Sequence, residues 1–523
     1  MTKLFSRVLS LILVLAFCFT IVACTKNPDD TTSSGSETES STTATPGPSS
    51  NDPTDTKNDN LDASGYLKDD LPDDLNTKFN GKTVTFLYWE DVEKTEFEPV
   101  GDMSDDLDKN LMARNQAVSD RLGITIEFRK TKGNNNNVDN FLQEVKVDYE
   151  NNRELDIIGT YSRSAGKCAS RGYFRDLNGV NYIDTSKPWY PDQLLKSLDI
   201  GGKLYFISGD ASVNTLYLMY TVYFNKELIE EYRLENPQDL VANKQWTIDK
   251  LIEMTKNTYQ NLDGDGDLGG SYDTDDFYGF CTIYYGVDAF YTGSGLKLVD
   301  NTDKTKIMKI SEDFTSEKSN NLLEKLGVWL TSADCNVYTG SKGKSGDYRV
   351  PFVKGNALFC QERCYLAENY LIGKEGREGV DFNYGVLPTP LFDEKQENYI
   401  TCLGNPFSLY SISRGCKDDE VDMLGAFIEC WSSESYRKTT PALFEVNMQL
   451  KYAQDSVDAQ MFDICKNTIT TDLGRVFSKD LNMMSELWSK AASTNANWAS
   501  QGKTYKTVLN NQLKAILKGF QNN

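Results

Sequence analysis

The sequence predicts an α/β protein with two lobes. Residues Thr83–Trp89 are rich in β-branched and aromatic side chains, and residues 124–128 alternate as a strand does. Between them, apolar residues recur at helical spacing: Leu107, Leu111, Val118 and Leu122. Residues 155–159 have the composition of a buried strand, typical of a parallel sheet covered by helices. About 450 residues follow Tyr66, too many for one ordinary core and enough for two domains.

The first 23 residues predict an export signal. Lys3 and Arg7 precede the apolar residues 8–22, a stretch too short for a permanent membrane span. With Ala23 before Cys24, the segment resembles a bacterial lipoprotein signal. That resemblance implies removal of residues 1–23 and lipidation of Cys24; the alternative is an uncleaved membrane anchor. We therefore expect a lipid-anchored protein on the outer face of the cytoplasmic membrane, at the cell surface.

Residues 24–66 predict a disordered tether. They are Thr, Ser, Asp, Asn, Gly and Pro with scarcely an apolar side chain, so they cannot bury enough surface to offset the entropy of ordering.

Composition excludes several function classes. The formal charge of −22 argues against nucleic acid or an anionic lipid surface as a partner, because both would repel the chain. The chain has no His, which removes Ser-His-Asp and Cys-His catalysis. Eleven Cys include Cys18 and Cys24 of the export segment, and the other nine are scattered. We expect these nine to be mostly buried free thiols, because a body of this size does not need disulfides.

Four blocks of sequence resemble the extracellular solute-binding proteins of ABC importers, the family that includes maltose-binding protein. The blocks occur in the family's order and cover most of residues 79–523. They are residues 155–158 with 169 and 172–177; residues 202–207, 223–228 and 246–249; residues 352–359 with 382–388; and a strand over 407–413, a helix over 423–433 and Pro441. Where the family commonly has a sugar-stacking Trp, this chain has Arg363-Cys364-Tyr365, which leaves the ligand open.

The resemblance implies a two-lobed α/β fold of the periplasmic-binding-protein type with hinge strands between the lobes. We expect lobe 1 over 79–208 and 407–450, and lobe 2 over 212–402 and 455–523. Crossings are expected near 206–212, near 402–407 and near Lys451. The implied function is capture of a carbohydrate, most simply an oligosaccharide, between the lobes and its delivery to ABC transporter permease subunits, without catalysis, by a monomer.

Candidate ligand-binding residues are aromatic and polar groups at strand ends, where ligands bind open α/β sheets. Aromatic faces pack on sugar C–H groups, while carboxylates, amides and Arg bind hydroxyls. Residues 216–224 predict a buried strand with Tyr217 reaching the cleft. The complete set is Trp89, Tyr161, Asp210, Tyr217, Gln361, Glu362, Arg363, Tyr365 and Asn405. For each aromatic residue, core packing is the competing interpretation, and for Trp329, Trp431 and Trp488 it is the one we favour.

An acidic, glycine-rich segment suggests a structural Ca²⁺ loop. Carboxylates at alternate positions of such a turn can converge on a hard cation. The candidate ligands are Asp263, Asp265, Asp267, Asp275 and Asp276. The segment departs from an EF-hand at Leu268 and Thr274, so a solvated acidic turn stays an equal alternative. No organic cofactor is expected.

Two other functions stay open at this stage. One is a surface glycoside-active enzyme that uses paired carboxylates, although no residues single out such a pair. The other is a sensor that presents its ligand to a membrane kinase, which would use similar outer surfaces of the lobes.

Overall fold

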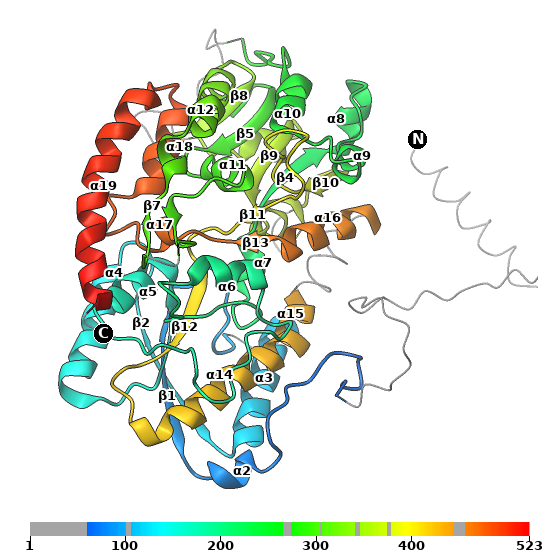
Figure 1. Ribbon diagram of the computed structural model, residues 1–523. Coiled ribbons are helices and arrows are strands. Elements are labelled where there is room, and N and C mark those ends of the chain that lie inside the picture. The colour runs from blue at the N-terminus through cyan, green and yellow to red at the C-terminus, as the bar shows by residue number, and fades with distance from the viewer. Residues whose placement is uncertain are drawn as a thin grey trace, which may run out of the picture. The chain divides into compact units, whose positions relative to one another are not determined.

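The computed structural model describes residues 60–100, 106–264, 274–303, 306–339, 346–373, 378–443 and 456–521. All of them belong to the compact unit Lys57–Asn523 (Figure 1). The predicted export signal, Cys24 and most of the tether lie outside the described residues. None of the helices in the described ranges combines the length and the apolarity needed to cross a bilayer.

The first sheet has the strand order β12-β3-β1-β2. β1 (Thr83–Trp89) pairs in parallel with β2 (Thr125–Thr131) and β3 (Ile157–Tyr161), and β12 (Ser408–Ile412) is antiparallel to β3. Helices α3 (Asp106–Leu122) and α14 (Val421–Arg437) pack against each other beside it, and α5 (Ser162–Ser170) packs on β3 and β12. The strand, helix, strand prediction for residues 83–128 is confirmed.

The second sheet has the order β10-β4-β9-β5-β8. β5 (Tyr278–Ile283) is parallel to β8 (Cys335–Tyr338) and β9 (Ala357–Arg363). β4 (Tyr220–Asn225) runs antiparallel to β9 and to β10 (Tyr384–Leu387). Every residue of β4, β5, β9 and β10 is buried, as expected for a sheet covered on both faces.

Two short strands connect the sheets. β11 (Thr401–Cys402) pairs in parallel with β13 (Ile469–Thr470). Along the chain, β11 lies between β10 of the second sheet and β12 of the first. β13 lies between α16 (Ser456–Asn467), which packs on β10, and α17 (Leu473–Val476), which packs on α5 of the first sheet. Both strands are therefore crossings between the two sheets.

A third passage between the sheets runs from Ile207 to β4. Ile207 forms a bridge with Tyr410 of the first sheet, and Met219 forms one with Leu403. Within this passage, Gly209 has φ +143°, and a Cβ there would collide with the carbonyl oxygen of Trp189, so the turn requires glycine. The crossing expected near Lys451 lies outside the described residues, and the exact lobe boundaries stay a prediction.

Residues 216–224 do not form one strand. α7 (Asn214–Tyr217) ends first, and β4 begins only at Tyr220. The backbone N–H groups of Tyr217 and Leu218 donate to the carbonyls of Val213 and Asn214, so local helical bonds replace strand pairing. The apolar alternation gave no sign of this turn.

Side-chain caps fix several helix starts. Thr247 Oγ1 accepts from the backbone N–H of Lys250 and begins α10 (Ile248–Thr255), in the Trp-Thr block. Asn225 caps α8 (Lys226–Glu231), and Asn236 caps α9 (Pro237–Ala242).

The remaining described elements are helices, short strands and single turns. They are α2 (Leu75–Lys78), α4 (Val138–Val147), a π-helical turn (Asp148–Asn152), α6 (Asp192–Leu198), α11 (Asp288–Gly293), β6 (Val299–Asp300), β7 (Lys309–Ile310), η2 (Glu312–Thr315), α12 (Glu317–Leu330), α13 (Val350–Val353), η3 (Ala367–Leu371), η4 (Asp418–Glu420), α15 (Thr439–Pro441), α18 (Met484–Ser493) and α19 (Trp498–Gln521).

The core confirms two expectations from the sequence. Trp329, Trp431 and Trp488 are all buried. The nine cysteines of the body are buried and free. Burial raises the pKa of thiols such as that of Cys168, so these groups stay protonated and unreactive.

Candidate ligand-binding site

The carboxyl ends of the parallel strands carry aromatic and charged side chains. In the first sheet, β1 ends at Trp89 and β3 ends at Tyr161. In the second sheet, β9 ends at Arg363, and Tyr285 follows β5 closely. Ligands of open α/β sheets bind beyond the carboxyl ends of the strands, so these side chains define the candidate site.

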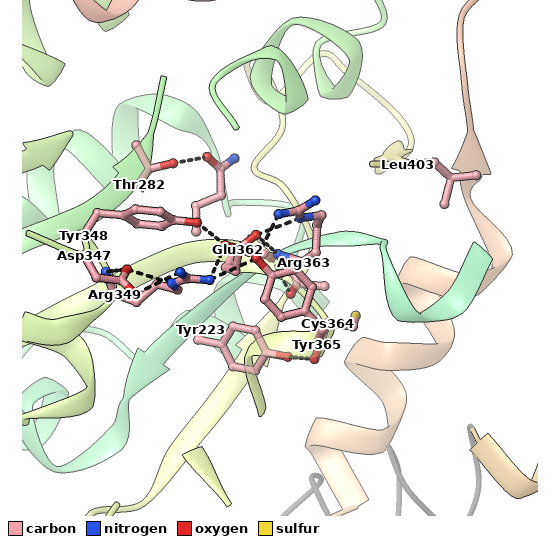
Figure 2. A network of polar contacts seen from close by, with 12 residues as sticks. Tyr223, Thr282, Asp347, Tyr348, Arg349, Glu362, Arg363, Cys364, Tyr365 and Leu403 are labelled. Carbon is pink, nitrogen blue, oxygen red and sulfur yellow. Dashed lines mark hydrogen bonds and ion pairs between the residues drawn. The ribbon is translucent and has the colours of Figure 1, made fainter. Parts of the chain in front are cut away.

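Glu362 is the centre of a buried polar cluster in the second sheet (Figure 2). Its Oε1 accepts from the backbone N–H of Arg363 at 2.7 Å and from the Arg363 Nε at 2.9 Å. Its Oε2 accepts from the Tyr365 hydroxyl at 2.8 Å and from the Tyr348 hydroxyl. Arg349 Nη1 lies 3.7 Å from the same oxygen. Both carboxylate oxygens are thus fully used.

These partners keep the carboxyl of Glu362 ionised. Burial alone would raise the pKa of Glu362, but Arg363, the Tyr348 hydroxyl, the Arg363 backbone N–H and Arg349 together hold that pKa below its ordinary value. A general acid needs a raised pKa, and a general base needs a free lone pair. Glu362 has neither, so the cluster is built to hold a shape rather than to transfer a proton.

The hydroxyl of Tyr365 is locked by its neighbours. It accepts from Arg363 Nη2 at 2.8 Å and from Arg349 Nη1 at 3.1 Å, while it donates to Glu362. Arg349 is held in turn by a bidentate pair with Asp347, at 2.7 Å and 2.8 Å. Two Arg and two carboxylates therefore cancel, and the cluster carries no net charge.

Arg363 lies among aromatic rings. Its guanidinium carbon is 4.7 Å from the centroid of Tyr365, 5.8 Å from that of Tyr285 and 5.9 Å from that of Tyr220. Such contacts fix the planar guanidinium without using all its donors. The half-buried ring of Tyr285 keeps part of its surface accessible.

Gln361 offers an unused donor next to this cluster. Its side chain is 1% exposed, and its Oε1 accepts from Thr282 Oγ1 at 2.9 Å. Its Nε2 has no hydrogen-bond partner among the described residues. A buried amide N–H without a partner is costly, so a ligand hydroxyl or a water would stabilise it.

Trp89 and Tyr161 form a pair at the end of the first sheet. Their ring centroids are 5.5 Å apart, and the Trp89 Nε1 donates to Ser408 Oγ at 2.7 Å. Trp89 is 0% exposed and Tyr161 2% exposed. The hydroxyl of Tyr161 has no hydrogen bond within the described part of the chain, and burial raises its pKa to about 12. Trp89 therefore supports Tyr161, whose hydroxyl is the group left for a ligand.

Tyr217 joins the second-sheet cluster from α7. Its ring lies 5.9 Å from that of Tyr365, and its hydroxyl donates to Asn369 Oδ1 at 3.4 Å. Lys94, which follows β1, places its Nζ 5.5 Å from the Tyr217 ring. Tyr217 thus lies against Tyr365, whose hydroxyl contacts Glu362 and Arg363; that these side chains bind a ligand stays a prediction.

Solved structures with a similar fold include proteins whose names describe sugar binding or transport. A cyclic α-maltosyl-1,6-maltose binding protein from Arthrobacter globiformis aligns over 83% of this chain and 100% of its own, with a TM-score of 0.55 and 15% identity. A sugar transporter protein from Rhizobium etli, in an open conformation, aligns over 82% and 98%, with a TM-score of 0.54 and 13% identity. The chain has the two-lobed solute-binding-protein fold.

A third solved structure agrees with this assignment of the solute-binding-protein fold. A cyclo/maltodextrin-binding protein complexed with maltotetraose aligns over 84% of this chain and 98% of its own, with a TM-score of 0.51 and 16% identity. No protein-family model and no curated protein sequence matches the chain. The fold predicted from the four sequence blocks is confirmed.

Two of the predicted ligand-binding residues, Asp210 and Asn405, lie apart from the Glu362 cluster. Asp210 is buried and accepts from Thr440 Oγ1 at 2.5 Å, and burial raises its pKa. Asn405 is half-buried and its backbone carbonyl accepts from Ser162 Oγ at 2.6 Å. Both contacts join the passages between the sheets to the first lobe, which gives these residues structural partners.

The acidic loop gives a divided result. Asp265 and Asp267 lie outside the described residues. Asp276 is fully buried, and its oxygens accept from the Tyr259 hydroxyl at 2.7 Å and from the Leu262 N–H at 2.8 Å. Asp275 pairs with Lys354, and Asp263 is exposed. Within the described ranges no three acidic, Cys or His side chains gather as a metal site would require, so calcium stays a prediction.

Among the residues of the site that sequence reasoning missed are Tyr285, Asp347, Tyr348 and Arg349. Tyr285 could have been found, because it follows the buried strand β5 as Tyr161 ends β3. Tyr348 and Arg349 precede α13, where no strand pattern points to a site.

Proposed function

We propose that this protein is the lipid-anchored substrate-binding component of an ABC importer. It captures a neutral oligosaccharide between its two lobes outside the cell and delivers it to permease subunits. The fold supports capture between lobes, and the sugars bound by proteins of similar structure support the ligand class. Anchoring through Cys24 rests on the sequence pattern alone.

The charge balance at Glu362 is the observation that carries the ligand class. Asp347, Arg349, Glu362 and Arg363 pair among themselves, so this cluster has no net charge with which to attract an ionic ligand. Tyr rings around Arg363 supply apolar faces, and Gln361 supplies a free amide donor. Apolar faces combined with a few fixed polar groups suit a neutral sugar.

Capture would proceed by closure of the lobes. A ligand that touches Tyr161 on one lobe and the Glu362 cluster on the other stabilises the closed form by its extra contacts there. Those contacts come from both sheets, so neither half of the site would bind the ligand as well alone.

Calorimetric titration of the chain with maltotetraose, other neutral oligosaccharides and their acidic counterparts tests this proposal. We expect binding of a neutral glycan, recovery of that glycan intact, and at least about tenfold weaker binding in Tyr285→Ala. Tyr232→Ala is the matched control, because this half-buried tyrosine stacks on Phe277 in the same lobe without contacting the cluster. Binding only of acidic sugars, or cleavage of the glycan, would refute the proposal.

The transport role is separable from the binding role. Uptake of the labelled glycan by cells should stop when the gene for this protein is deleted. It should return when the full-length protein is expressed again. Normal uptake together with a lost transcriptional response to the glycan would instead identify the sensor.

A further inference from the structure

A cavity lies beside the crossing strands, outside the candidate ligand site. Its volume is about 570 Å³. Its walls come from α6, from residues 292–302, from residues 398–400 that lead into β11, and from residues 467–473 that contain β13. None of its lining residues belongs to the Glu362 cluster or to the Trp89–Tyr161 pair. We name it the hinge cavity.

The position of the hinge cavity couples it to lobe movement. β11 and β13 are crossings between the two sheets, and the cavity is lined by residues of β13 and by those that lead into β11. Crossing strands absorb the backbone changes of hinge closure. A molecule in the cavity would therefore contact the segments that rearrange when the lobes open.

Hydrogen bonds hold the walls of the hinge cavity in place. Asn301 Nδ2 donates to the carbonyls of Lys196 at 3.0 Å and Asp199 at 2.9 Å, which satisfies the end of α6. Asp472 accepts from the N–H groups of Leu298 at 2.9 Å and Val299 at 3.2 Å. The cavity is thus a formed site and not a gap between loose loops.

The lining indicates the class of ligand. More than half of the lining side chains are amides or hydroxyls of Asn, Gln, Ser and Thr. The Oγ1 of Thr471, which lines the cavity, is buried and has no hydrogen-bond partner among the described residues. Leu296 and Ile400 add apolar surface, and the charged lining residues Lys196, Lys297 and Asp472 carry both signs, which favours neither a cation nor an anion strongly. This combination suits a small neutral molecule with several hydroxyls.

We propose that the hinge cavity is a second binding site for a small neutral polyhydroxylated molecule, such as a monosaccharide or a polyol, whose occupancy shifts the open–closed equilibrium of the lobes. The binding itself is independent of the proposed function, whereas its effect on capture rests on that function. A molecule that fits the cavity better in one lobe arrangement changes the affinity for the glycan. By linkage, the glycan changes the affinity for that molecule by the same factor.

Hydrogen exchange of the full chain with D-glucose and with D-mannitol tests the binding. We expect protection of the amides in 295–302 and 467–473. Asn467→Trp places a bulky ring at this lining position, which is exposed at the end of α16, and should abolish that protection. Gln460→Trp, at an exposed position of the same helix outside the cavity, should leave it unchanged. No protection with either probe, or protection that persists in Asn467→Trp, would overturn the site.

A second experiment tests the regulation and separates the two possible failures. Glycan affinity measured at saturating D-glucose or D-mannitol should change by about twofold to tenfold in the wild type, and not in Asn467→Trp. Unchanged wild-type affinity would overturn the regulatory effect. Tyr285→Ala should keep the protection of the hinge cavity; if it does while no glycan binds the wild type, the proposed function fails and the hinge cavity stands.

Discussion

Lys94 and Glu368 form an ion pair that joins the two lobes, with Nζ 2.8 Å from Oε1. Lys94 follows β1 of the first sheet, and Glu368 lies in η3 after β9 of the second. Both side chains are largely buried, at 14% and 12% exposure. The backbone around Lys94 is held by Asn214, which donates to the Lys94 carbonyl at 2.8 Å and accepts from its N–H at 3.1 Å. The pair is therefore a largely buried contact between the lobes in this arrangement.

Removal of this pair should favour the open form. Lys94→Ala removes the ion pair with Glu368, and we expect a loss of about 1 kcal/mol or more from the closed state, seen as about fivefold faster glycan release. Stopped-flow dissociation measures this. Lys109→Ala breaks the exposed pair with Asp106, at 53% and 59% exposure, and should leave release unchanged. Equal release rates in wild type and Lys94→Ala would show that the pair does not hold the lobes together.

Replacing Glu362 alone should lower the free energy of unfolding more than replacing Glu362 and Arg363 together. Glu362→Gln leaves the buried Arg363 and the half-buried Arg349 beside a neutral amide, and we expect a loss of about 3 kcal/mol in the free energy of unfolding. In the double variant Glu362→Gln/Arg363→Gln, part of that loss should return, because no unpaired charge is left at this pair. Urea unfolding of the three proteins measures both effects.

The stability lost in Glu362→Gln should depend on pH. The folded-state pKa of Glu362 lies below its ordinary value, so its contribution is complete above the unfolded pKa and is lost as pH falls through the folded pKa. The stability difference between wild type and Glu362→Gln should therefore be constant at neutral pH and shrink in acid. A difference that grows in acid would contradict the lowered pKa.

The sequence predicted three strands of the first sheet because these strands are local patterns. Residues 83–89, 124–128 and 155–159 carry β-rich runs, and each forms a strand. The lobe-two site was predictable for a related reason: Glu362 and Arg363 end a buried strand, which is where the fold places ligand groups.

The rest depends on contacts between distant parts of the chain. Nothing local shows that Arg349 reaches Glu362, or that Lys94 reaches Glu368, 274 residues away. Trp89 ends β1 as predicted, yet its indole N–H is used by Ser408, 319 residues away. Strand ends thus give the region of a site, while tertiary packing decides which side chains remain free for a ligand.

Calcium removal tests the acidic loop. If Asp263, Asp265, Asp267 and their neighbours hold Ca²⁺, added Ca²⁺ should raise the melting temperature and excess chelator should lower it, because the ion binds only the folded loop. Asp263→Asn should remove the response to Ca²⁺. Asp276→Asn is the contrasting variant: this carboxylate already accepts from Tyr259 and Leu262, so its loss should destabilise the protein with or without the ion. A melting temperature that changes with neither Ca²⁺ nor chelator would mean that the acidic loop is a solvated turn without a bound ion.

The buried carboxyl of Glu429 should make the protein less stable as pH rises. Burial raises its pKa to about 7, although the Asp184 N–H and the Tyr190 hydroxyl donate to it at 3.2 Å and 3.0 Å. Between the unfolded pKa, about 4.3, and pH 7 the folded state binds more protons than the unfolded state, so stability falls with rising pH across this window. Glu429→Gln keeps both acceptor contacts without the charge.

We therefore expect Glu429→Gln to match the wild type near pH 4 and to exceed its stability at pH 8 by about 1–3 kcal/mol. Urea midpoints at the two pH values measure this. Glu127→Gln is the control, because that side chain is 54% exposed and should show no such pH-dependent gain. If Glu429→Gln is less stable than the wild type at pH 8, the charged carboxylate is stabilised by its two donors, and burial does not dominate at this position.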